Sequence, residues 1–189
     1  MNAVILNGSD GEIALNNAGK ILALELKNNG WNVESYNLYK EKIATCIGCY
    51  GCWLKTPGQC IIKDKGQEIA EKVIKSDLLI LLSPVTFGGY SFHLKKVVDR
   101  LIPNILPFFT KINGEMHHKP RYKNNPKILA IGYLPRHNEE SERIFTALVS
   151  RNAINMHSPE NHVEFITDNE ADVSAFKVNS MFEKVGMIT

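Results

Sequence analysis

The chain has 189 residues, of which 44% are hydrophobic and 22% are charged, and its formal net charge is +2. This composition is ordinary for a globular protein and differs from that of disordered chains. A small net charge without a basic run lacks the electrostatic signature of nucleic-acid binding, and the longest apolar run, residues 78–82, is too short to cross a bilayer. We therefore expect one domain over residues 1–189, with no nucleic-acid partner and no membrane partner.

Short apolar runs alternate with amphipathic stretches along the chain. The run at 78–82 is apolar at every position, as in a parallel strand covered by helices on both faces. The alternation predicts an α/β fold, a flavodoxin-like doubly wound sheet of five parallel strands in the order 2-1-3-4-5 with helices on both faces. The predicted strands cover residues 3–6, 31–38, 78–82, 128–132 and 162–166, the predicted helices cover 15–28, 67–75, 92–102, 139–152 and 170–184, and two long loops, one rich in cysteine, cover 45–62 and 103–126.

In this strand order, ligands bind in the crevice at the carboxyl ends of the first and third strands. The loop over residues 7–16 opens a helix, whose free N–H groups and dipole can hold a phosphate. The glycine fingerprints of dinucleotide and Walker sites are absent, so a mononucleotide phosphate is the better interpretation. An ordinary strand-to-helix turn remains the alternative.

The loop after the third strand, residues 83–89, has the composition of a site for a flat ligand. Pro84 restricts its backbone, Gly88 and Gly89 permit close approach, and Phe87 offers an aromatic face. A planar ring with polar edges suits such a loop. The alternative is a tight loop with a core phenylalanine.

The four cysteines of the chain, Cys46, Cys49, Cys52 and Cys60, lie within fifteen residues of one another. Thiolates are soft ligands suited to iron–sulfur clusters or zinc, and the first three cysteines are spaced as in ferredoxin cluster runs. The spacing favours a cluster over zinc. Free thiols without metal stay equally open, because cysteine is a common buried small residue. Clustered thiols without a secretory signal lead us to expect a cytoplasmic protein.

Three segments carry a resemblance to the family of NAD(P)H-dependent FMN reductases and iron–sulfur flavoproteins, whose fold is flavodoxin-like. They are Asn7-Gly8-Ser9, the cysteine segment 46–60, and residues 83–88 together with Leu94-Lys95 and Asp99-Arg100. The resemblance implies an FMN cofactor, NAD(P)H as co-substrate, a possible 4Fe–4S cluster on the four cysteines, and a homodimer or homotetramer. The implied phosphate-binding residues are Gly8, Ser9, Asn16 and Asn17, and the implied ring-binding residues are Pro84, Val85, Thr86, Phe87 and Gly88.

The phosphate loop departs from the family pattern, in which proline and arginine commonly follow Gly-Ser. This chain has Asp10, Gly11 and Glu12 there, so the loop carries no cation. A carboxylate about 6 Å from the phosphate costs roughly 3 kcal/mol of repulsion at an effective dielectric near 20. We therefore expect Asp10 to turn outward and FMN to bind loosely.

Few other side chains carry a functional prediction, and none is predicted to be catalytic, because the flavin itself supplies the chemistry. Lys95 and Asp99 are expected to form a solvent-exposed pair four residues apart on a helix, and His117 and His118 are expected to be exposed loop residues. The function predicted is electron or hydride transfer from NAD(P)H or a reduced carrier to a quinone, a flavin or a protein acceptor. A non-catalytic iron–sulfur flavoprotein carrier and a flavin-free binding module are the alternatives.

Overall fold

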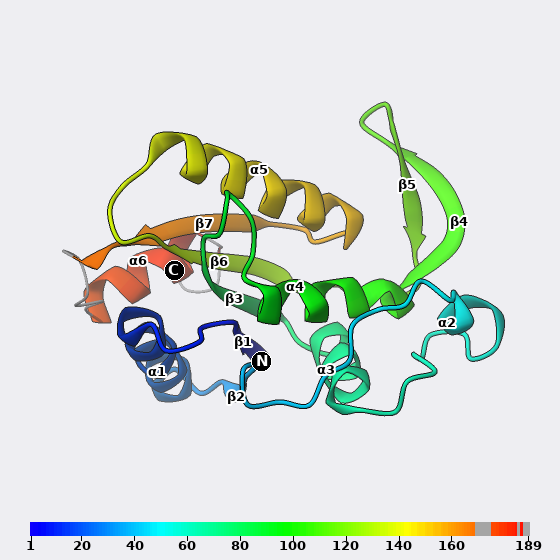
Figure 1. Cartoon of the computed structure of the whole chain (residues 1–189), viewed down its shortest axis with the longest axis horizontal. Coiled ribbons are helices and arrows are strands. Elements are labelled where there is room, and N and C mark those ends of the chain that lie inside the picture. The colour runs from blue at the N-terminus through cyan, green and yellow to red at the C-terminus, as the bar shows by residue number, and fades with distance from the viewer. Residues whose placement is uncertain (169–174, 185, 187–189) are drawn as a thin grey trace.

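The structure, a computed structural model, describes residues 1–168, 175–184 and 186. Its main sheet is parallel throughout, with the strand order β2-β1-β3-β6-β7 (Figure 1). The predicted flavodoxin-like order is therefore confirmed, with β6 and β7 as the fourth and fifth strands of the sheet. The strands are β1 (Asn2–Asn7), β2 (Asn32–Asn37), β3 (Leu78–Pro84), β6 (Lys127–Tyr133) and β7 (Asn161–Ile166).

Helices cover both faces of this sheet. Two pack on one face and three on the other, as the alternating sequence predicts. In the described part of the chain, no helix combines the length and the apolar character needed to cross a membrane. On the first face lie α1 (Ile13–Asn28) and α6 (Ala175–Lys184), and on the second lie α3 (Lys65–Ile74), α4 (Phe92–Val98) and α5 (Glu139–Asn155), with a short α2 (Gly51–Leu54) in the cysteine segment and a 3₁₀ helix η1 (Asp99–Asn104) after α4.

The core follows from the pleat of β3, because successive side chains of a strand point to opposite faces. Leu78, Ile80 and Leu82 pack against α1 and α6, while Leu79 and Leu81 pack against α3, α4 and α5. All five side chains are at most 2% exposed. The predicted helix 92–102 is found as α4 continued by η1, and residues 170–174 of the last predicted helix lie outside the described residues.

The prediction of a long loop over residues 103–126 is wrong, because most of this stretch forms a β-hairpin. Strands β4 (Ile105–Ile112) and β5 (Glu115–Pro120) pair antiparallel and extend away from the main sheet (Figure 1). Between them, Asn113 has φ +49° and Gly114 has φ +88°. Two successive positive φ values define the tight turn that Asn-Gly favours, so this dipeptide was the sequence signal of the hairpin.

The histidines of β5 anchor the hairpin, which corrects the expectation that both are exposed. The side chain of His117 is only 6% exposed, and its Nδ1 lies 2.8 Å from Oδ1 of Asn155 on α5. His118 is half-buried, and its ring lies 4.9 Å from the ring of Trp53. The Trp53 indole donates to the Ile105 carbonyl at 3.0 Å. Since an isolated two-stranded hairpin is marginally stable in water, these contacts hold it against the domain.

A buried arginine fastens both ends of the cysteine segment. Arg100 is 1% exposed, and its two terminal nitrogens donate to both carboxylate oxygens of Asp64 at 2.8 and 3.0 Å. The same guanidinium donates to the carbonyls of Ala44 and Ile62, which precede the first cysteine and follow the last. The backbone N–H of Ala44 also donates to Asp64. This clamp fixes where the cysteine segment leaves and rejoins the domain.

The loops after β1 and β3 are joined directly. Ser91, which caps α4, donates from Oγ to the carbonyl of Gly8 at 2.7 Å and from its backbone N–H to Ser83 Oγ at 2.8 Å. The Gly8 N–H donates to the Leu82 carbonyl. A Cβ on Gly8 would lie 2.6 Å from Ser91 Oγ and 2.8 Å from the Leu94 Cβ. The absence of a side chain at Gly8 therefore permits this approach.

Gly8→Ala is predicted to lower the free energy of unfolding by about 1–3 kcal/mol, the usual cost of overpacking. Urea denaturation measures the change. Gly89→Ala is the matched control, because its Cβ would meet only the Thr86 carbonyl oxygen at 3.4 Å and neither glycine has a positive φ. Equal stability of the two variants would contradict this account of the contact.

Arg100→Met is predicted to cost about 3–5 kcal/mol of stability, because it leaves the Asp64 carboxylate, 15% exposed, without its cation. Lys95→Ala is the control. As predicted from the sequence, Lys95 pairs with Asp99 at the surface, at 2.6 Å with side chains 52% and 45% exposed, so its loss should cost less than about 0.5 kcal/mol. A loss below about 1 kcal/mol for Arg100→Met would contradict the clamp.

The same pair predicts an acid dependence of stability. Burial acts to raise the pKa of Asp64, but hydrogen bonds from Arg100, Ala44 and Gly66 outweigh it and hold the pKa below the ordinary 3.8. When the pKa of a carboxyl group is lower in the folded state than in the unfolded state, its ionised form stabilises the folded protein at pH values above the unfolded pKa. This stabilisation is lost as the pH falls through the folded pKa. The stability difference between wild type and Asp64→Asn should therefore be constant near neutral pH and shrink below about pH 3.8. A difference independent of pH would refute it.

Candidate functional site

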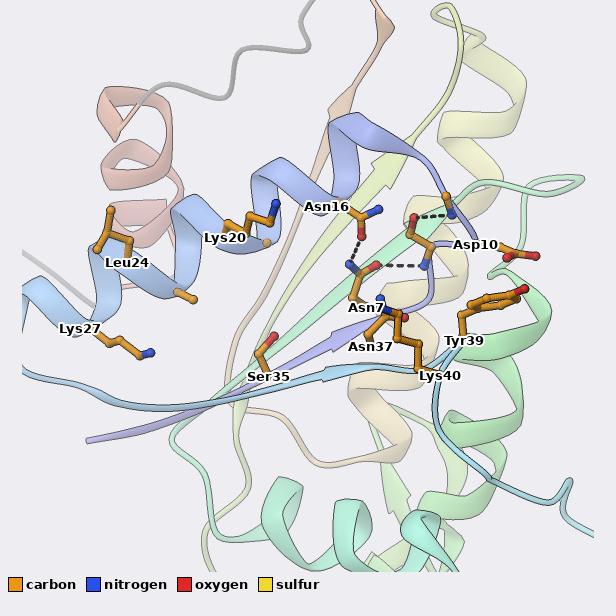
Figure 2. A pocket seen from close by; sticks show the side chains of 14 residues that line it. Asn7, Asp10, Asn16, Lys20, Leu24, Lys27, Ser35, Asn37, Tyr39 and Lys40 are labelled. Carbon is orange, nitrogen blue, oxygen red and sulfur yellow. Dashed lines mark hydrogen bonds between the residues drawn. The ribbon is translucent and has the colours of Figure 1, made fainter.

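The loop between β1 and α1 is built around Asn7, the last residue of β1. Asn7 belongs to a segment that carries the family resemblance, but no binding role was predicted for it. Asn7 is 8% exposed, accepts from the Ser9 N–H at 2.9 Å through Oδ1, and donates to Asn16 Oδ1 at 2.8 Å through Nδ2 (Figure 2). These bonds join three of the polar residues around the predicted phosphate site. An asparagine at the carboxyl end of a buried strand was the signal available in the sequence. Asn17 is exposed and has no hydrogen bond to this loop among the described residues.

The two acidic residues of the loop behave differently. The side chain of Asp10 is 55% exposed and lies 3.9 Å from His93 Nε2 on α4, so it is turned outward as expected. The carboxylate of Glu12 turns inward. Its Oε2 accepts from Ser9 Oγ at 2.8 Å and from the Asp10 N–H at 2.9 Å. The predicted outward direction of Asp10 is thus confirmed, but the hydrogen bonds of Glu12 were not predicted, because the sequence alone does not show where a side chain points.

A tyrosine from the end of β6 lies beside this acidic loop. The Tyr133 hydroxyl donates to Asp168 at 2.6 Å. This bond, followed by burial and by the negative charges of Asp168 and Glu12, raises the pKa of Tyr133 to about 12. The phenol is therefore a neutral donor at physiological pH, and it lies near the carboxylates of Asp168 and Glu12.

The loop after β3 presents the ring of Phe87 to solvent, whereas Gly88 in the same loop is buried. Phe87 has φ +50° and is fully exposed, which excludes the alternative of a core phenylalanine. Thr86 and Gly89 exchange backbone hydrogen bonds across the turn, while the N–H groups of Phe87 and Gly88 have no partner among the described residues. A positive φ in a non-glycine residue costs about 1–2 kcal/mol and marks a position for functional scrutiny. The turn can meet the face of a planar ligand with Phe87 and its edge with the two amides.

The neighbouring predicted ring-binding residues attach this turn to β6 and α5. Val85 is half-buried and donates its N–H to the Tyr133 carbonyl at 2.9 Å, which ties the loop to β6. Gly88 is buried against α5, where a Cβ would lie 2.6 Å from Ile144 Cγ2. Pro84 is half-buried at the end of β3, and Thr86 is exposed. The structure therefore brings Pro84 to Gly88 together as one loop, held at both sides.

A cavity of about 840 Å³ begins at the phosphate loop and runs along α1 toward the edge strand β2 (Figure 2). No residue of the ring loop lines it, so it extends away from the position expected for a planar ring. The end of the cavity at the phosphate loop can receive a phosphate, whereas the other end lies between α1 and β2. The lining residues are Asn7, Ser9, Asp10, Gly11 and Asn16 at the loop, Gly19, Lys20, Ala23, Leu24 and Lys27 on α1, and Ser35, Asn37, Tyr39 and Lys40 from β2 and the turn after it.

The four cysteines line one small cavity together with Arg100. Cys46 and Cys49 are exposed, Cys60 is half-buried and Cys52 is buried, and all four are free thiols. Burial raises the pKa of Cys52, and the charges of Cys60, Cys46 and Cys49 raise it further. The thiols are thus neighbours, although in the described residues no three metal-binding side chains are already arranged to hold an ion.

The donor chemistry of this cavity nevertheless fits a thiolate-bound metal group. Arg100 Nε is buried without a hydrogen-bond partner. Burial acts to lower the pKa of Arg100, whereas Asp64 and the nearby Cys60 raise it, and the net direction is upward. A buried guanidinium that stays charged beside four cysteines can offset the negative charge of thiolates, so the residues present fit the group that the cysteine spacing predicts.

Comparisons with known proteins show which family the chain resembles. Residues 1–133 match the family model described as NADPH-dependent FMN reductase. An iron–sulfur flavoprotein of Archaeoglobus fulgidus is 38% identical over 106 residues, which are 54% of this chain and 46% of the relative. An iron–sulfur flavoprotein of Methanocaldococcus jannaschii is 42% identical over 74 residues, 39% of this chain and 37% of the relative. The chain spans about half the length or less of the curated relatives that it matches.

Solved structures share the fold at low identity. The NAD(P)H:quinone oxidoreductase from Methanothermobacter marburgensis has a TM-score of 0.65 at 12% identity, with 98% of this chain and 95% of that chain covered. An azoreductase from Bacillus anthracis has a TM-score of 0.66 at 11% identity, with 98% and 96% covered. The family match covers more than two thirds of the sequence, from β1 to the end of β6. This chain therefore belongs to the NADPH-dependent FMN reductase family.

Proposed function

We propose that the chain is an FMN-dependent oxidoreductase that accepts hydride or electrons from NAD(P)H or a reduced carrier and passes them to a quinone, a flavin or a protein. The observation that supports it is the hydrogen-bonded junction of the β1 and β3 loops, which unites a phosphate-binding turn with an exposed aromatic turn at the switch point of the sheet. The family match of residues 1–133 supports the same function.

The residues divide the work of binding. Ser9 and the amino end of α1 face the phosphate, and the turn from Pro84 to Gly88 faces the ring. FMN, when bound, supplies the hydride and electron chemistry, so the protein has to orient it and leave one face open to a donor. The free amides of Phe87 and Gly88 can donate to polar atoms at the ring edge. No catalytic side chain is required by this division.

A 4Fe–4S cluster on Cys46, Cys49, Cys52 and Cys60 is the finer part of the proposal. Its support is the cavity that the four thiols share with Arg100 and the names of the iron–sulfur flavoproteins that resemble the chain. The cluster would allow electrons to leave one at a time toward a protein acceptor. A homodimer or homotetramer and a cytoplasmic location stay predictions from the sequence.

The exposed faces near the hairpin favour the oligomer. Phe108, Phe109 and Met116 on the hairpin and Tyr50 and Leu54 in the cysteine segment are each at least half exposed. Large apolar side chains gathered on exposed elements mark surfaces that are buried on association. A second copy of this chain is the partner that we propose for them.

Phe87→Ala is predicted to weaken FMN binding by about tenfold, because base-sized rings gain roughly 1–3 kcal/mol from an aromatic platform. The free energy of unfolding should change by less than about 0.5 kcal/mol, since the side chain is fully exposed in the free protein. Fluorescence titration with FMN and urea denaturation measure the two quantities. Phe92→Ala, also an exposed phenylalanine at 66% but outside the ring loop and the proposed interface, is the control. Unchanged FMN affinity in Phe87→Ala would remove Phe87 from the ring site.

The absorption spectrum of anaerobically purified protein, with iron, sulfide and zinc analysis, tests the function as a whole. A flavin spectrum with NAD(P)H oxidation is the expected result, and about four iron atoms per chain are expected if the cluster forms. Cys60→Ser should lose the iron and keep the flavin. Flavin and iron without NAD(P)H oxidation would favour the electron carrier, and a colourless protein that shows no thermal shift with FMN would favour the flavin-free module.

A further inference from the structure

In the proposed phosphate site, a carboxylate of the chain already accepts hydrogen bonds from groups that could bind the phosphate. Glu12 Oε2 accepts from the Ser9 hydroxyl at 2.8 Å and from the backbone N–H of Asp10 at 2.9 Å. Ser9 is 2% exposed, so its hydroxyl has little access to water. Two donors of this loop, the Ser9 hydroxyl and the Asp10 N–H, are therefore already bound to an anion that belongs to the chain.

The position of Glu12 explains why the carboxylate turns inward. Glu12 immediately precedes the first residue of α1, Ile13, and no side chain caps the helix there. The positive end of a helix dipole attracts an anion, and a carboxylate forms charge-assisted bonds with hydroxyl and backbone donors much as a phosphate does. Residues 8–12 include no lysine or arginine that could hold both anions at once. A phosphate that binds at this loop therefore competes with Glu12 for the Ser9 hydroxyl and the Asp10 N–H, although Lys20 and Lys40 line the adjoining cavity.

We propose that Glu12 is the specificity-determining residue of the flavin site, an internal competitor that the FMN phosphate must displace. The inference rests on the proposed function. Riboflavin has no phosphate and leaves Glu12 in place, so the wild-type site should distinguish FMN from riboflavin only weakly. A phosphate that is held against a competing carboxylate also dissociates readily, which makes flavin an exchanging substrate of the reductase and not a permanently held group.

A different role would produce the opposite effect of substitution. If the Glu12 bonds served only to shape the loop, their loss would disorder Ser9 and Asp10 and weaken the binding of FMN. The comparison of two flavins that differ only in the phosphate separates the roles, because the ring contacts at Pro84–Gly88 are common to both.

The test is fluorescence titration of the full chain with FMN and with riboflavin, in wild type, Glu12→Ala, Glu12→Gln and Asp10→Asn. Glu12→Ala should bind FMN at least about tenfold more tightly, the usual effect of one charge-assisted interaction, and riboflavin within about twofold of wild type. Glu12→Gln, which is neutral but can still accept these bonds, should lie between the two. Asp10→Asn, the acidic neighbour turned outward, should change the ratio of the two affinities least.

Each outcome decides the inference. An unchanged ratio of FMN to riboflavin affinity in Glu12→Ala, or weaker FMN binding in a variant that keeps the wild-type melting temperature, would overturn the role of Glu12 while leaving the flavin function intact. Failure of both flavins to bind wild type and all variants would overturn the flavin function and this inference together.

Discussion

The hydrogen bond from Ser91 Oγ to the Gly8 carbonyl is the interaction on which the site depends. It brings the loop after β1 against the first turn of α4, while the Ser91 N–H fixes Ser83 at the end of β3. Neither loop could approach this closely with a side chain at position 8. The loops after β1 and β3, which we propose bind the phosphate and the ring of FMN, are thus held against each other at the point where the strand order reverses.

One segment links this crevice to the cysteines. The chain passes from the ring-binding turn into α4 and then η1, where Arg100 binds Asp64 and both ends of the cysteine segment. A buried ion pair contributes little net stability by itself, but breaking it is costly, so it fixes one arrangement of the chain. The segment from Ser83 to Asn104 therefore connects the loop after β3 to the clamp that holds the cysteine segment.

The fold could be predicted from strands whose side chains are buried on both faces of the sheet, as in β3. Leu78–Leu82 is apolar at every position and predicts a central strand, and right-handed crossovers make 2-1-3-4-5 the leading choice among the possible strand orders. The hairpin was not predicted, although Asn113-Gly114 encodes its turn, because the proline and histidine residues on either side of the dipeptide are typical of a loop. The loops of the site were located correctly, but the direction of a side chain within a loop depends on the donors it meets. For this reason the hydrogen bonds that Glu12 accepts, and those that join Asn7 to Ser9 and Asn16, were not predicted.

A crystal structure of the chain grown with FMN would show whether the cofactor lies between the β1 and β3 loops. We expect the phosphate at Ser9 and the amino end of α1, with Glu12 displaced, and the flavin ring against Pro84–Gly88. FMN bound with its ring in the cavity between α1 and β2, or a crevice that stays empty at saturating FMN, would contradict it.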